Sequence, residues 1–199
     1  MTPRPVTALS FDALDEGLQA ALAPIVDRLG YFGEFFQYVG HAPAALSGFM
    51  DYTAAVKSLL PDRLNELVAL SICSALNCSY ERIQHERLSD RLGLERDWIA
   101  ALVGRAPVAG LPTEELAVRA LALAVATRDV DGARSSLATV AGAYGEPTAI
   151  ALLLQATRFV TICTIAELFA LSLPVPSIFD EPSSQARGAT GATSVFSNR

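Results

Sequence analysis

Three side chains that could carry chemistry, a thiol, a carboxylate and an imidazole, follow one another at helical spacing in the middle of the chain. If residues 79–92 form a helix, Cys78, Glu81 and His85 occupy positions i, i+3 and i+7 and share one face. Leucines continue that face as far as Leu92, so we expect it to point into the protein. Ionisable groups on an inward face form a candidate site.

The chemistry of these residues depends on which of them acts. A histidine one helical turn from a carboxylate can donate or accept a proton. A cysteine at a helix N-terminus has its thiolate favoured by the dipole, although Glu81 opposes that effect. Each residue alone also fits a structural role: Cys78 as a small buried side chain, His85 as a hydrogen-bonded core residue, and Glu66 as the ion-pair partner of Arg63.

The elements that position these residues read as helix after helix, with no convincing alternating strand. We expect an all-α protein of about eight helices, in which no sheet exceeds a hairpin. The predicted helices cover residues 12–29 with an interruption near Pro24, His41 to Leu60, Pro61 into the central stretch, 79–92, 94–103, 113–127, a helix capped by Asp131 and ending at Ala143, and a long apolar helix that follows Gly145. Aromatic residues crowd residues 30–40, and we interpret them as core or interface rather than as a ligand cage.

The amino-acid composition indicates which classes of binding partner the protein has. Hydrophobic residues make up 51% of the 199 residues and charged ones 18%, an apolar excess that indicates a subunit interface. The net charge is −6, and the 15 basic residues are not clustered, which argues against nucleic acid and against anionic membrane surfaces. The apolar run at residues 149–173 is interrupted by Gln155, Arg158 and Glu167, so we expect a buried or interfacial helix rather than a membrane span.

The numbers of cysteines and histidines indicate the cellular compartment and which cofactors to expect. Three cysteines cannot build a disulfide framework, and the acidic N-terminus has no export signal, so we expect a cytoplasmic protein. Two histidines without a CxxC or HExxH motif argue against zinc. No glycine-rich phosphate loop is present, so we expect no cofactor. The chain also has no GxSxG motif, the nucleophile elbow of many serine hydrolases.

The order Glu66, then Cys78-Ser79-Tyr80-Glu81, then His85 resembles the carboxymuconolactone decarboxylase and alkylhydroperoxidase D-like (AhpD-like) family. Its redox members have a glutamate, a CxxC motif about three helical turns later, and a histidine four residues after the second cysteine. Here Glu66, Cys78 and His85 match, and Glu81 stands in place of the second cysteine. The segments 41–46 and 61–67 also resemble the family's helix starts.

The resemblance covers roughly residues 12–173 and implies an AhpD-like helical domain. We therefore assign residues 1–173 to a single domain and residues 174–199 to a Pro/Ser/Gly-rich tail that is flexible or packed on a neighbouring subunit. The same resemblance implies a homo-oligomer, as a trimer, hexamer or dimer, that acts on a small-molecule substrate.

The presence of Glu81 in place of the second cysteine determines which of the family's activities we expect in this protein. A CxxC peroxidase needs a resolving thiol, Cys73 should face another direction on one continuous helix, and Cys163 could approach only through the fold. The decarboxylase branch resembles the Glu81–His85 arrangement. We therefore expect cofactor-independent acid–base chemistry on a small carboxylated or lactone-like substrate, with His85 moving a proton, Glu81 orienting the imidazole or raising its basicity, and Glu66 assisting. We also expect Glu81 and His85 to share a proton near neutrality. The alternatives are a thiol peroxidase or reductase that uses Cys78, and a non-catalytic oligomer that binds a small molecule.

Overall fold

The computed structural model describes residues 4–180, apart from the side chain of Ala109, and every regular element in that range is helical. This confirms the expected all-α class. The elements are a 3-10 turn at Phe11–Ala13, α1 (Glu16–Leu29), α2 (Glu34–Val39), α3 (Pro43–Ser58), α4 (Asp62–Ala75), α5 (Ser79–Arg91), α6 (Arg96–Leu102), a 3-10 turn at Val108–Gly110, α7 (Thr113–Thr127), α8 (Val130–Tyr144) and α9 (Glu146–Leu168).

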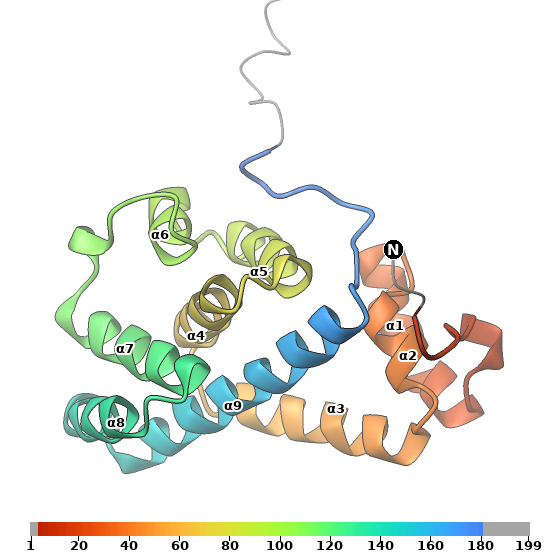
Figure 1. The fold of residues 1–199 in the computed structure, drawn as a ribbon, viewed down its shortest axis with the longest axis horizontal. Coiled ribbons are helices and arrows are strands. Elements are labelled where there is room, and N and C mark those ends of the chain that lie inside the picture. The colour runs from red at the N-terminus through yellow and green to blue at the C-terminus, as the bar shows by residue number, and fades with distance from the viewer. Residues whose placement is uncertain (1–3, 181–199) are drawn as a thin grey trace, which may run out of the picture.

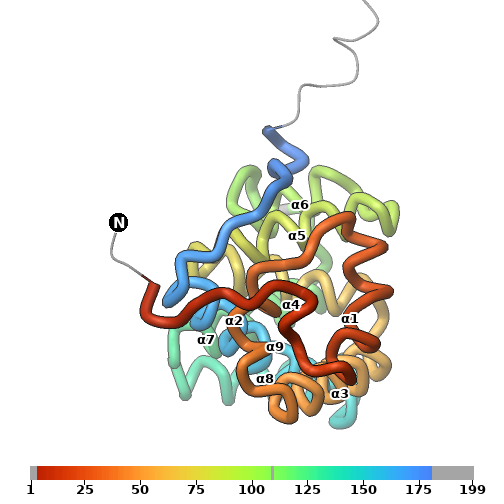
Figure 2. Tube along the Cα trace, turned by 90° about the vertical axis from the view of Figure 1, so that its right-hand side faces the viewer, coloured from red at the N-terminus to blue at the C-terminus, as the bar shows by residue number. Residues whose placement is uncertain are grey.

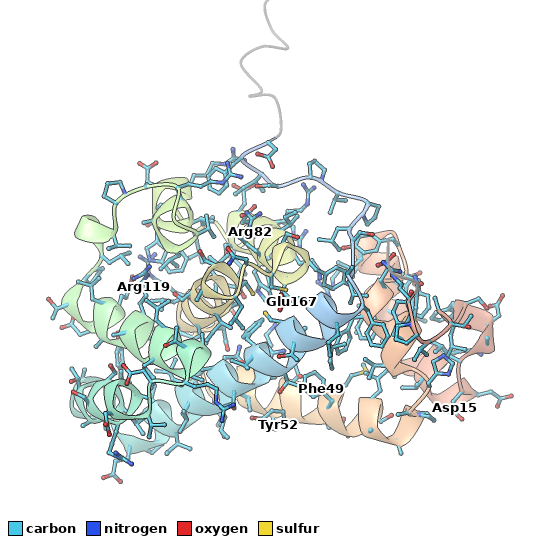
Figure 3. The ribbon with its side chains drawn as sticks, viewed as in Figure 1. Asp15, Phe49, Tyr52, Arg82, Arg119 and Glu167 are labelled. Atoms are coloured by element: carbon cyan, nitrogen blue, oxygen red, sulfur yellow. The ribbon has the colours of Figure 1, made fainter. Side chains whose placement is uncertain are left out.

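Helix α9 is the axis of the arrangement and runs diagonally through the molecule (Figure 1). It contacts α3, α4, α5, α7 and α8, while the α1–α2 pair lies near its C-terminal end. On α3, Phe49 and Tyr52 extend toward α9 (Figure 3), and the Tyr52 hydroxyl donates to the carbonyl of Leu154 at 3.1 Å. Helix α9 therefore connects the group formed by α1, α2 and α3 with the group formed by helices α4 to α8.

Two helices form the centre of the core. Helix α4 has ten consecutive buried residues, from Leu64 to Cys73. Helix α9 has the length and apolar composition of a membrane span, but 56% of its most apolar window is buried inside the protein. A helix that is apolar all round belongs to the core of a packed domain or to a membrane. Here α9 packs on five other helices and acts as a core helix.

The aromatic stretch forms a helix that the sequence did not predict. Helix α2 is only six residues long and lies between Gly33 and Gly40, so it is too short to show a helical period. Phe35 and Tyr38 are buried in the core, as expected for this cluster. The extra helix raises the number of α-helices in residues 4–180 to nine, against the eight predicted.

The expected interruption at Pro24 is wrong, because α1 continues through it without a break. A proline inside a helix removes one intrahelical hydrogen bond and crowds the preceding turn. The preceding turns of α1 are anchored by Leu18 and Leu22, which are buried almost completely. Tertiary packing therefore outweighs the local cost at Pro24.

The predicted cap of α8 is also wrong by two residues. Arg128 takes a left-handed conformation with φ of 59° and ends α7, which leaves Asp129 as the first extended residue. The Asp129 carboxylate accepts the N–H of Gly132 at 3.0 Å and caps the helix. Asp131 lies in the first turn instead and pairs with Arg134 at 2.9 Å.

The N-terminal and C-terminal segments of the described chain meet at one edge of the molecule (Figure 2). Arg4 near the N-terminus donates to the carbonyl of Ala170 at 2.8 Å. Residues 174–180 then pass over α5, where Ser177 and Ile178 are buried and Arg87 donates to the carbonyl of Pro176 at 3.2 Å. This part of the expected tail thus packs on its own chain, and the remainder of that tail lies outside the described residues.

A buried hydrogen bond also holds residues 174–180 on α5. Ser177 donates to the carboxylate of Glu86, which is fully buried and also pairs with Arg82. We predict that Ser177→Ala lowers the free energy of unfolding by about 1–2 kcal/mol, because a buried carboxylate loses one of its donors. Chemical denaturation measures the change, with Ser135→Ala on the exposed face of α8 as the control. Equal stability of the two variants would contradict the prediction.

The oligomeric state stays a prediction. Large apolar side chains are exposed on α8 and α9, including Val130, Ile150 and Leu154. These residues are compatible with a subunit contact. Light scattering of the purified protein measures the assembly directly.

Candidate functional site

The site is built where α4 and α5 meet. Helix α4 ends at Ala75, and Asn77 takes a left-handed conformation with φ of 53°. Cys78 is then the residue before α5 and its backbone N–H donates to the carbonyl of Cys73 at 2.9 Å. This tight connection folds α5 back against α4. Helix α5 consequently presents Tyr80, Glu81, Glu86 and Ser89 as a buried, mostly polar face.

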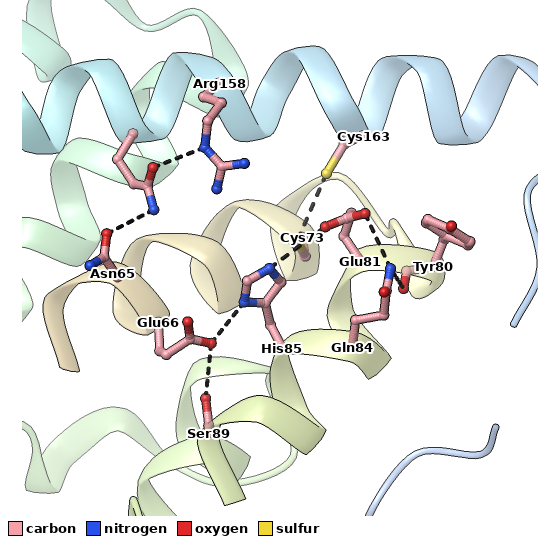
Figure 4. A network of polar contacts seen from close by, with 11 residues as sticks. Asn65, Glu66, Cys73, Tyr80, Glu81, Gln84, His85, Ser89, Arg158 and Cys163 are labelled. Carbon is pink, nitrogen blue, oxygen red and sulfur yellow. Dashed lines mark hydrogen bonds and ion pairs between the residues drawn. The ribbon is translucent and has the colours of Figure 1, made fainter. Parts of the chain in front are cut away.

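His85 lies between two carboxylates (Figure 4). Its Nδ1 is 2.7 Å from Oε2 of Glu66 on α4, and its Nε2 is 3.6 Å from Oε2 of Glu81, one turn earlier on α5. Ser89 donates to the same Glu66 oxygen at 3.3 Å, and the imidazole edge packs on the Phe159 ring with centroids 4.9 Å apart. Both the position and the orientation of the ring are therefore fixed.

The structure brings Glu66, Glu81 and His85 together and reverses the expected order of their contacts. Sequence spacing pointed to Glu81 as the residue that orients the imidazole, with Glu66 assisting. The short contact belongs to Glu66, which is 2% exposed, whereas Glu81 is farther from the ring and also accepts from Gln84 at 3.3 Å. The inward face also ends earlier than expected, because Leu92 is 41% exposed.

The two carboxylates keep His85 charged. Burial lowers the pKa of His85, but the negative charge and hydrogen bond of Glu66, followed by those of Glu81, outweigh it and raise the pKa to about 9. The imidazole is then protonated near neutral pH, with one N–H donated to Glu66. We expected this histidine to share a proton near neutrality, so its affinity for the proton is higher than the sequence indicated.

Cys78 belongs to a cluster of three thiols. The sulfur atoms of Cys73 and Cys163 are 3.8 Å apart, and Cys78 also forms a hydrogen bond with Cys163. All three cysteines are buried and free. The hydrogen bond with Cys163 and burial raise the pKa of Cys78 far above its ordinary value, and the backbone N–H of Glu81 opposes this only in part. Cys78 is therefore a neutral thiol.

A cavity of about 440 Å³ opens beside the histidine, between α1, α2, α3, α5 and α9. His85 and Glu81 line it, whereas Cys78 and Glu66 are not among its lining residues. Aromatic and aliphatic side chains form most of the wall, including Phe35, Phe36 and Phe49. The aromatic stretch of α2, interpreted from sequence as core or interface, thus also lines the cavity.

The polar part of the wall is mostly basic. Arg28, Lys57, Arg91 and Arg158 line the cavity, and Glu81 is its one acidic lining residue. Four cations around one cavity stand out in a protein whose net charge is −6. Within residues 4–180, no group of three or more His, Cys, Asp or Glu residues is placed to hold a metal ion.

Comparison with known proteins places the centre of the chain in a family. Residues 41–127 match the model described as the carboxymuconolactone decarboxylase (CMD) family. Residues 41–127 belong to this CMD family. The CMD segment begins just before α3 and ends with α7, so it includes all four residues predicted for the site. A comparison with curated proteins gives no significant match.

Solved structures of AhpD-like proteins share the fold. The debrominase Bmp8, determined with 2,3,4-tribromopyrrole, has a TM-score of 0.74 and 18% identity, over 87% of this chain and 94% of that chain. A peroxidase-related protein of Silicibacter has a TM-score of 0.71 and 16% identity, over 86% and 94%. An AhpD core protein of Ralstonia eutropha has a TM-score of 0.67 and 16% identity, over 86% and 93%. The chain therefore has the AhpD-like helical fold that we expected.

Three residues of α9 in the site region lie outside the CMD segment and were not predicted from the sequence as site residues. Arg158 and Gln155 on α9 were interpreted only as interruptions of an apolar run, and Cys163 as a distant thiol. Arg158 lines the cavity and Cys163 contacts Cys73. The signal available was the i, i+3 spacing of Gln155 and Arg158 on an otherwise apolar helix, where polar groups need partners.

Proposed function

We propose that this CMD-family protein catalyses cofactor-independent proton transfer on a small carboxylated or lactone-like molecule, with His85 as the proton donor. The observation that carries the proposal is an imidazole held between two buried carboxylates on the wall of a cavity of substrate size. Loss of carbon dioxide from an activated carboxylate is the reaction that best suits such a donor.

Each residue has a defined part in this reaction. When the bond between carbon and the departing carboxyl group breaks, its electron pair stays on carbon, in conjugation with a neighbouring carbonyl. The proton on Nε2 of His85 then moves to that carbon, and solvent restores it. Glu66 accepts the hydrogen bond from Nδ1, which holds the ring and stabilises the imidazolium. Glu81, beside Nε2, relays the returning proton.

Thiol chemistry is less well supported by the geometry. A thiol reacts with hydroperoxides or disulfides as its thiolate, and burial beside Cys163 keeps Cys78 neutral. The cavity reaches His85 and Glu81 without Cys78 on its wall. Similar folds include peroxidase-related proteins and a debrominase, but at 16–18% identity they share the fold and not necessarily the reaction.

The test compares the two chemistries in one set of variants. Purified protein is incubated with carboxymuconolactone, and released carbon dioxide is measured for the unaltered chain and for Cys78→Ser. We expect decarboxylation in both at rates within about threefold, because the thiol takes no part in the proton transfer. The same proteins are assayed with an organic hydroperoxide and a dithiol reductant, together with Glu81→Cys, which recreates a CxxC pair and should gain activity. Strong peroxidase activity of the unaltered chain that vanishes in Cys78→Ser would overturn the proposal.

A further inference from the structure

A buried cation lies on the most apolar helix of the protein. Arg158 is 6% exposed, and burial lowers its pKa. Its guanidinium lies over the Phe159 ring, 4.0 Å from the centroid. A buried charge is costly unless it is paired or used, so Arg158 needs an explanation that packing alone does not supply.

A chain of buried amides holds this guanidinium in one orientation. The Nε of Arg158 donates to Oε1 of Gln155 at 2.9 Å, and Nε2 of Gln155 donates to Oδ1 of Asn65 at 2.9 Å. Asn65 in turn donates to the carbonyls of Lys57 and Leu60 at 3.2 and 3.1 Å. The chain ties Arg158 to the junction of α3 and α4, so its donors are oriented before any ligand binds.

The outer edge of the guanidinium is open. The two terminal nitrogens of Arg158 have no hydrogen-bond partner among residues 4–180, and Figure 4 shows them on the side away from Gln155. Arg158 lines the same cavity as His85 and Glu81. A pair of parallel N–H donors on a rigid fork matches the two oxygens of a carboxylate.

The remaining wall indicates what the carboxylate is attached to. Phe35, Phe49, Met50 and Ile162 line the cavity and favour an apolar body. Arg158 is the one buried arginine on this wall, because Arg28 and Arg91 are exposed. Its planar fork satisfies one carboxylate. A phosphate dianion would bring more charge and more acceptors than one guanidinium satisfies.

We propose that Arg158 is the specificity-determining residue of this cavity, and that it binds a carboxylate of a small organic acid with an apolar body beside His85. The inference rests on the proposed acid–base function only for what happens to the acid after it binds. Arg158 lies on α9, outside the CMD segment, so the residues that match the family do not supply this contact.

Binding measurements test the inference without any turnover. Benzoate and cinnamate are titrated calorimetrically at low salt, beside their neutral amides benzamide and cinnamamide. The unaltered protein should prefer each acid over its amide by about tenfold or more, because a buried charge-assisted pair forms only with the acid. Equal affinity for acid and amide, or no binding of either acid at millimolar concentration, would overturn the inference.

Two substitutions locate the effect. Arg158→Met should weaken binding of the acids about 10- to 100-fold and leave the amides within about threefold, and Arg158→Lys should retain part of the preference. Arg134→Met, on the exposed face of α8, removes the same charge far from the cavity and serves as the control. Circular dichroism and the thermal midpoint verify that each variant is folded. If Arg158→Met binds the acids as tightly as the unaltered chain, the inference is wrong.

The outcome separates this inference from the proposed function. His85→Gln should still bind benzoate, because the contact belongs to Arg158. If acids bind through Arg158 while no proton transfer is found, the inference stands and the proposed reaction fails. If decarboxylation occurs with unchanged efficiency in Arg158→Met, the reaction stands and the inference fails.

Discussion

Replacing His85 with glutamine should reduce the rate of decarboxylation about 100- to 10,000-fold, the range that a positioned general acid contributes. Glutamine keeps a donor for Glu66 and much of the side-chain volume, but it has no proton to transfer near neutral pH. The rate at saturating substrate should fall, with little change in substrate affinity, since the loss is confined to the transition state.

His41 provides the matched control. It is the other of the two histidines in the chain and is exposed. Its Nε2 lies 2.8 Å from the carbonyl oxygen of Thr7. His41→Gln should keep full activity. If His85→Gln loses less than about threefold, proton donation by this residue is not part of the mechanism.

The second large effect concerns stability and pH. The folded-state pKa of His85 is raised to about 9, above its ordinary value of 6.5, so folding takes up a proton between those values. The resulting stabilisation is fully present below about pH 6.5 and is lost as the pH rises through about 9. A shift of this size corresponds to roughly 3 kcal/mol.

Denaturation at a series of pH values measures this contribution as the difference between the unaltered chain and His85→Gln. The difference should be largest below pH 6.5 and should shrink toward pH 10. In Glu66→Gln the pH dependence should flatten, because the nearest negative charge is removed. NMR titration of the His85 ring measures the same pKa directly. A His85 ring that titrates near its ordinary pKa would contradict the prediction.

Much of this site could be predicted from sequence because its residues are local. Helical spacing alone places Glu81 and His85 on one face, and Pro43, Pro61 and Thr113 mark helix starts by their chemistry. The family resemblance added Glu66, which lies nineteen residues before His85 and contacts it across two helices.

The remainder depends on packing between distant helices. Cys163 is ninety residues from Cys73, and no local pattern indicates that α9 brings the two sulfur atoms together. The ranking of Glu66 over Glu81 follows from the angle between α4 and α5 and not from spacing. Helix α2 was missed because six residues between two glycines are too few to reveal a period.

Helix α9 crosses the whole fold, so the site is built from two separate parts of the chain. The proposed proton donor and its carboxylates come from α4 and α5, whereas the arginine that lines the same cavity comes from α9. Substitutions at positions 158 and 162 could therefore redirect substrate choice while the proton chemistry on α5 stays in place. Related proteins that bind other acids should then differ mainly in their last helix, which lies outside the CMD segment.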